Sequence, residues 1–125
     1  MDAVQKFSPA LGRVFLALIF ILAGLGKIPA PAGSIGYMEA YGVPGILFWP
    51  SVIVEVGAGI ALLVGYQARW AALALGLFSL LTAVIFHTDF ADQMQLTAFL
   101  KNLAIAGGML YVFAFGAGPF SVDNR

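Results

Sequence analysis

The sequence predicts an all-α integral membrane protein, a four-helix bundle with a short interfacial helix between spans one and two. Of its 125 residues, 62% are hydrophobic and only 10% are charged, whereas a soluble domain of this size exposes far more charge. The hydrophobic residues gather in runs that are close to the roughly 17–25 residues a helix needs to cross a membrane. The predicted spans of this single transmembrane domain, residues 1–125, are 11–28, 46–64, 69–86 and 97–115.

The first span follows Ser8-Pro9, a typical start for a helix. One face of this helix carries residues that repeat at steps of three and four, namely Arg13, Ala17, Phe20, Gly24 and Lys27. A secretory signal peptide is the alternative, because a basic start, an apolar run and Ala-Pro-Ala at 30–32 resemble one. Lys27 lies between the apolar run and that cleavage pattern, and three further spans follow. We therefore expect the segment to be retained.

Residues 29–44, which connect the first two spans, are rich in glycine and proline and contain an amphipathic insert. Tyr37, Met38 and Tyr41 suit the membrane interface, where aromatic side chains gather, while Glu39 suits water. This pattern predicts a short helix that lies in the interface. An ordinary ordered loop is the alternative.

The positions of lysine and arginine predict that both termini are cytoplasmic, because short loops rich in these residues stay on that side. The basic residues on the predicted cytoplasmic side are Lys6, Arg13, Arg69 and Arg125, against Lys27 and Lys101 on the other side. Arg13 and Arg69 are therefore interpreted as cytoplasmic anchors. The short tail after the fourth span, residues 116–125, is expected to be poorly ordered.

Glu55 is the most unusual residue of the sequence, because it is an acid inside the second hydrophobic run. An ionised side chain in hydrocarbon costs at least about 2.5–3.5 kcal/mol, so an acid there needs a partner or a task. On a helix, Glu55 lies about 8 Å below Pro50, too deep for a short side chain to reach water. Glu55 is therefore predicted to face other helices. A buried salt bridge that only fixes the helix register is the alternative to a functional role.

Threading the four spans up and down brings five polar residues to one level, toward the non-cytoplasmic side: Lys27, Glu55, His87, Lys101 and Asn102. Opposite charges nearby would keep Glu55 ionised between the two lysines. This cluster predicts a pocket for a small anion or for the oxygen of a quinone, with His87 able to pass a proton near neutral pH. For each lysine alone, snorkelling from a span end is the alternative.

Several other chemistries are disfavoured by the sequence. It has no cysteine and a single histidine, so it offers no thiolate metal site and cannot supply both axial ligands of a haem within one chain. His87, Asp89 and Asp92 form only a weak metal-binding pattern. The glycines at 57–59 lie inside a span and lack the third glycine of a dinucleotide loop. The formal net charge is zero, and no nucleic-acid partner is expected. We expect no intrinsic metal or cofactor.

Three stretches resemble the DoxX family of small four-span membrane proteins. They are LGRVFLALIFILAGLGK at 11–27, VEVGAGIALLVGYQAR at 54–69 and KNLAIAGGML at 101–110. The polar positions that match the family pattern are Arg13, Lys27, Glu55, Arg69, His87, Lys101 and Asn102. The resemblance implies a bacterial or archaeal inner membrane protein. Some relatives in this family are subunits of thiosulfate:quinone oxidoreductase, but no motif here identifies thiosulfate as a substrate.

Two functional hypotheses follow. In the first, the chain is a membrane subunit of a redox system, with a quinone or small-anion pocket centred on Glu55 and Lys101; it is then not a complete enzyme alone and needs a redox partner subunit. In the second, it is a non-enzymatic membrane anchor or small carrier, and its polar cluster only locks the bundle. Small residues on the helix faces are compatible with a homo-oligomer, since they let helices approach closely in lipid.

Overall fold

The computed structural model describes residues 2–123, and this part of the chain is helical and contains no strand. The elements in order are α1 (Ala3–Lys27), α2 (Pro31–Ala40), a 3-10 turn η1 (Gly45–Leu47), α3 (Phe48–Ile53), a π-helical turn η2 (Val54–Ala58), α4 (Gly59–Val64), α5 (Ala68–Phe86) and α6 (Gln93–Phe115). The predicted all-α class is confirmed, and α2 is the predicted short helix between the first two spans.

Four helical stretches of the described chain are long and apolar enough to cross a membrane: α1, the continuous run from η1 to α4, α5, and α6. Two of them begin earlier than the apolar runs indicate. Asp2 accepts a hydrogen bond from Gln5 N at 3.0 Å, and Asp92 accepts one from Met94 N at 3.0 Å. These side chains cap α1 and α6, so polar residues extend each helix beyond its apolar part.

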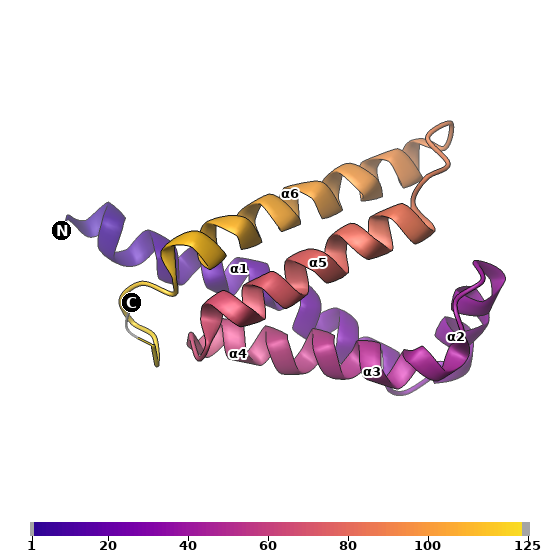
Figure 1. Ribbon diagram of the computed structural model, residues 1–125, viewed down its shortest axis with the longest axis horizontal. Coiled ribbons are helices and arrows are strands. Elements are labelled where there is room, and N and C mark those ends of the chain that lie inside the picture. Colours follow the sequence, from indigo (N-terminus) through magenta and orange to yellow (C-terminus); the bar gives the residue numbers. More distant parts are fainter. Residues whose placement is uncertain (1, 124–125) are drawn as a thin grey trace.

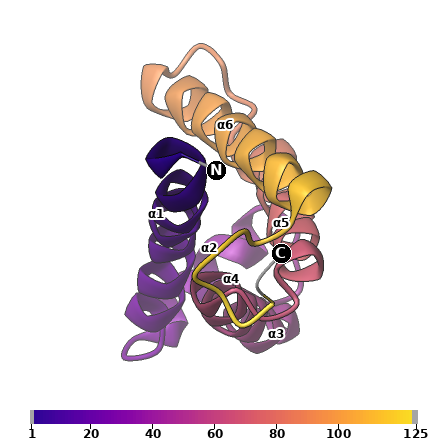
Figure 2. The same cartoon turned by 90° about the vertical axis from the view of Figure 1, so that its left-hand side faces the viewer.

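The second span lies between α1 and α5, while α6 packs along α5 (Figure 1). Viewed from the end, α1 and α6 stand apart on one side of the bundle (Figure 2). The two ends of the described chain lie together, at what we call the terminal end; α2 and the α5–α6 loop lie at the other, the loop end (Figure 1). The core between the helices is built from small and aliphatic side chains, including Ala17, Leu62, Leu75 and Met109.

Arg13 lies at the terminal end, and its side chain is only 2% exposed. Its guanidinium donates four hydrogen bonds to backbone carbonyls, namely those of Leu62 at 3.0 Å, Leu63 at 2.8 Å, Ala117 at 2.9 Å and Phe120 at 3.0 Å. The last carbonyls of a helix have no partner within it, so Arg13 satisfies the end of α4 and the tail together. Its N–H donors therefore bind carbonyl groups of the protein. As a cytoplasmic anchor, Arg13 was expected to place these donors at the membrane surface.

The expectation of a poorly ordered tail was wrong for residues 116–123, which fold back over the α4–α5 turn. Val122 N donates to Val64 O at 3.0 Å, and Asp123 N donates to Gly65 O at 2.9 Å. The Asp123 carboxylate accepts from the backbone N–H groups of Gln67 and Ala68 at 2.9 and 2.8 Å. The tail is ordered because the turn offers unpaired backbone groups. Arg125, assigned above to the cytoplasmic side, lies outside the described residues.

At the loop end, α2 is held against α5 by aromatic contacts. The ring centroids of Tyr37 and Tyr41 lie 5.3 and 5.1 Å from that of Phe86. The aromatic residues that suggested an interfacial helix therefore also fix its position beside the last turn of α5.

Candidate functional site

Glu55 lies in the π-helical turn η2 and is 2% exposed. Such turns are rare in helices and occur frequently at functional sites. The facing residue of α1 is Gly24, and a Cβ atom there would lie 2.5 Å from Val56 Cγ2 and 3.3 Å from Glu55 Cβ. Because glycine has no Cβ, α1 and the second span can approach closely at the level of the carboxylate. Glu55 is thereby held among helices, as the sequence indicates.

One oxygen of Glu55 is paired and the other is not. Lys27, the last residue of α1, places its Nζ 2.5 Å from Glu55 Oε1. Glu55 Oε2 is buried and has no hydrogen-bond partner among the described residues, the one buried side-chain oxygen or nitrogen there of which this is true. An unsatisfied buried acceptor costs about 1–3 kcal/mol, so a group that donates to Oε2 would stabilise the site.

A cavity of about 150 Å³ lies beside Glu55, and all four spans line it. Its polar lining consists of Glu55, Ser79, Thr82, Lys101 and Asn102, and its apolar lining includes Phe20, Phe78 and Ile105. The residues that line the cavity therefore include one acid and one base within mostly apolar walls. In the remainder of this article it is called the Glu55 cavity.

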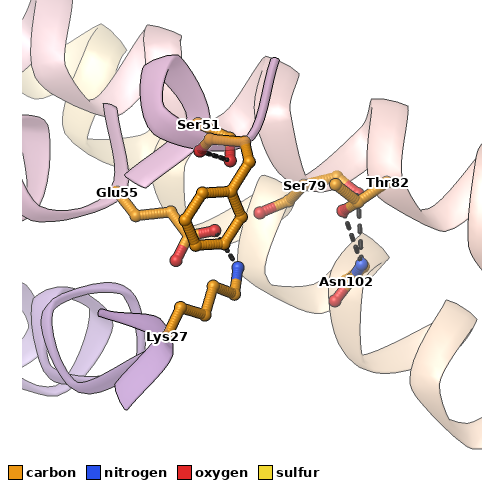
Figure 3. Close-up of polar contacts among 7 residues, drawn as sticks. Lys27, Ser51, Glu55, Ser79, Thr82 and Asn102 are labelled. Atoms are coloured by element: carbon orange, nitrogen blue, oxygen red, sulfur yellow. Dashed lines mark hydrogen bonds and ion pairs between the residues drawn. The ribbon is translucent and has the colours of Figure 1, made fainter. Parts of the chain in front are cut away.

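The amide of Asn102 connects α6 to α5 beside this cavity. Asn102 Nδ2 donates to Ser79 O at 3.2 Å and lies 3.1 Å from Thr82 Oγ1, which itself donates to Ser79 O at 3.1 Å. Figure 3 shows Lys27 pointing at Glu55, with Ser79 between this pair and the Thr82–Asn102 contact in this view. The amide group of Asn102 therefore donates its hydrogen bonds to α5. Lys101 is the basic residue among those that line the cavity.

The structure brings most of the predicted cluster together. Glu55, Lys101 and Asn102 line the Glu55 cavity, and Lys27, which does not line it, is paired with Glu55. His87 does not line it, because α5 continues for one more turn after Thr82 and His87 follows its last residue. Burial lowers the pKa of the His87 imidazole, and the positive charge of Lys101 lowers this pKa further. His87 is therefore neutral at pH 7.

Two residues of the cavity wall, Ser79 and Thr82, were not among the predicted site residues. Ser79 belongs to a stripe of small residues that recurs along α5, and such stripes are most simply explained by helix packing. The hydroxyl group of Ser79 on this stripe of small residues is the signal that could have identified Ser79 from the sequence. Thr82 follows one turn later, and only its contact with Asn102 reveals its place.

The described residues contain no group of three or more histidine, cysteine, aspartate or glutamate side chains able to hold a metal ion. The weak pattern of His87, Asp89 and Asp92 does not form a site, because the Asp92 carboxylate caps α6.

The comparisons with known proteins agree with this architecture. The DoxX family model matches residues 8–88. The chain belongs to the DoxX family. It is 40% identical over 124 residues to the inner membrane protein YqjF of Escherichia coli K12, which covers 99% of this chain and 95% of that one. It is 33% identical over 122 residues to the inner membrane protein YphA of the same strain, covering 92% and 87%.

A more distant relative of this DoxX-family protein is eukaryotic. The ER-derived vesicles protein ERV29 of Saccharomyces cerevisiae is 29% identical over 129 residues, covering 99% of this chain but only 35% of ERV29. No solved structure matches the chain. Together with the four apolar helices, the two bacterial relatives support a multi-pass protein of the inner membrane whose surroundings are the lipid bilayer.

Proposed function

We propose that this DoxX-family protein is a membrane subunit of a redox system that binds the headgroup of a quinone in the Glu55 cavity, on the non-cytoplasmic side. The observations that carry the proposal are two: Glu55 and Lys101 both line one cavity, and Glu55 Oε2 is a buried acceptor without a hydrogen-bond partner among the described residues. A ligand that fits this cavity offers a hydrogen-bond donor to Glu55 and an acceptor to Lys101.

The two redox forms of a quinone meet these requirements. A quinol carries hydroxyl groups, and one of them can donate to the carboxylate of Glu55, which lines the cavity. A quinone carries carbonyl oxygens, and one of them can accept from the Lys101 ammonium group. The apolar walls formed by Phe20, Phe78 and Ile105 suit a single planar ring.

A small anion suits the cavity less well. Glu55 is already paired with Lys27, so this pair carries no net charge toward a ligand. An anion without a proton would face Glu55 Oε2 as one acceptor against another, and only Lys101 would oppose its charge at the cavity wall. We therefore favour the quinone of the two ligand classes that the sequence suggests.

Oxidation of a quinol releases two electrons and two protons. In the proposal, a redox partner subunit takes both electrons, and Glu55 accepts the first hydroxyl proton, passes it on, and then accepts the second. Lys27 holds the carboxylate in place through its ion pair with Glu55 Oε1. His87, which is neutral and lies at the end of α5, is the group that we assign to pass protons toward water.

The proposal is tested by native mass spectrometry of the detergent-purified protein, with organic extraction of any bound molecule. We expect the wild type to retain a quinone and Glu55→Gln to retain much less of it, because a neutral amide accepts a hydrogen bond from a quinol hydroxyl more weakly than a carboxylate does. Glu39→Gln on the exposed side of α2 is the matched control and is expected to retain the quinone. Absence of quinone from the wild type, or equal retention in Glu55→Gln, contradicts the proposal.

The second candidate function is a membrane anchor or small carrier whose polar cluster is structural. The Lys27–Glu55 ion pair favours it, because this pair ties the end of α1 to the second span. In that case Glu55→Gln lowers the thermal stability in detergent and leaves any bound small molecule in place. Measuring thermal unfolding alongside ligand retention therefore separates the two functions.

A further inference from the structure

A second and larger cavity lies between α1 and α6, toward the terminal end of the bundle. It has a volume of about 480 Å³, and its lining includes Gly12 and Leu16 of α1 and Gly108, Tyr111 and Val112 of α6. We call it the α1–α6 groove. The two helices whose residues line it, α1 and α6, stand apart on one side of the bundle (Figure 2).

The groove continues the Glu55 cavity along the same two helix faces. On α1, the lining passes from Phe20 in the Glu55 cavity to Leu16 and then Gly12 in the groove, in steps of four. On α6, it passes from Ile105 to Gly108 in a step of three. Residues at these spacings lie on one face of a helix, so the two cavities follow one another turn by turn.

At the boundary between the cavities, Leu16 lies directly over Gly108. A Cβ atom at Gly108 would be 3.1 Å from Leu16 Cδ2. The flexible side chain of Leu16 and the glycine at 108 therefore lie in close contact where the two linings meet.

The chemistry of the groove suits hydrocarbon. Arg13 borders it, but its guanidinium is directed at four backbone carbonyls of the α4 end and the tail. The remaining lining is glycine, proline, aliphatic or aromatic. A phosphate or carboxylate headgroup therefore meets no uncommitted cation, whereas an apolar chain fits without loss of any hydrogen bond.

We propose that the α1–α6 groove holds the isoprenoid tail of the quinone whose headgroup lies beside Glu55. This inference rests on the proposed function and extends it, because it makes the site selective for long-chain quinones. The path from Phe20 to Gly12 along α1 is about 12 Å, at 1.5 Å per residue. A tail that leaves the Glu55 cavity along this path fills the groove instead of entering the lipid directly.

The test compares a benzoquinone that carries one isoprene unit with the same ring carrying a long isoprenoid tail. Affinities are measured by titration of the full chain in phosphatidylcholine nanodiscs. The variant is Gly12→Phe, which fills the groove, and the control is Gly107→Phe, which lines neither cavity. A Cβ atom at either glycine meets no atom within 4 Å, so both variants are expected to fold.

We expect Gly12→Phe to weaken binding of the long-tailed quinone about tenfold, the effect of one side chain that overpacks a fitted site. Binding of the short quinone is expected to stay unchanged, and Gly107→Phe is expected to change neither affinity. An equal loss for both quinones in Gly12→Phe, or no loss for either, overturns the inference. Retention of a phospholipid in the groove while the long-tailed quinone is bound also overturns it.

Failure of the tail inference is distinguishable from failure of the proposed function. If the short quinone binds and Glu55→Gln weakens its binding, the proposed function stands, and a long-tailed quinone insensitive to Gly12→Phe overturns the tail inference alone. If neither quinone binds to the wild type, the proposed function and the tail inference are both wrong.

Discussion

Replacing Arg13 by leucine is expected to destabilise the protein strongly. The guanidinium is buried and donates four hydrogen bonds to carbonyls of α4 and the tail. Each charge-assisted hydrogen bond contributes about 1.5–3 kcal/mol to stability. The sum of these four contributions is an upper limit, because the contributions of neighbouring bonds are not additive. Removing the guanidinium leaves these carbonyls without a partner at about 1–3 kcal/mol each, and because such costs do not add fully we expect a loss of about 3–5 kcal/mol for Arg13→Leu.

The assay is unfolding of the detergent-solubilised protein by sodium dodecyl sulfate, followed by circular dichroism. Arg69→Leu removes the same charge from an exposed position at the start of α5, and its expected effect is within about 0.5 kcal/mol. Arg13→Leu should also increase hydrogen exchange of residues 117–123, since their carbonyl anchor is lost. If the two leucine variants unfold at the same detergent fraction, the reasoning from the Arg13 contacts is refuted.

Two further predictions concern the loop end. Lys27→Met leaves Glu55 as an unpaired buried acid and should lower the free energy of unfolding by about 3–5 kcal/mol in the same assay. Adding Glu55→Gln should recover most of this loss. A further loss in the double variant contradicts the prediction. The pKa of His87 is lowered below its ordinary value of 6.5 by burial and by Lys101, so the unfolded chain binds its proton more readily than the folded one. Stability is therefore complete above pH 6.5 and falls on acidification through that value; His87→Gln should flatten the decline, and an unchanged pH profile contradicts the assignment.

The transmembrane class was predictable because it depends on composition and on the length of apolar runs. The starts of α1 and α6 were not, because they depend on the caps Asp2 and Asp92, which lie in polar sequence. The order of residues 116–123 was also missed. This order results from hydrogen bonds to backbone groups of the α4–α5 turn. Backbone groups are the same in every sequence, so these contacts produce no recognisable residue pattern.

Within the candidate site, Glu55 could be identified from sequence because the cost of burying a charge depends only on residue type and depth. Which lysine pairs with Glu55 could not be identified from the sequence. Lys27 and Lys101 lie at the same predicted level, and only the close crossing at Gly24 brings Lys27 to the carboxylate. The unpaired second oxygen and the neighbouring cavity depend on how four helices pack, which periodicity along one helix does not contain.

The contacts of Arg13 also affect the order in which the protein can fold during its synthesis. Its hydrogen-bond acceptor at Ala117 lies 104 residues further along the chain. At synthesis rates of about 5–20 residues per second, α1 exists for roughly 5–20 s before that carbonyl has been made. During this interval the carbonyls of Leu62 and Leu63 are made first, whereas those of Ala117 and Phe120 are still missing. The first span can therefore complete the contacts of Arg13 only after residues 117–120 have emerged from the ribosome.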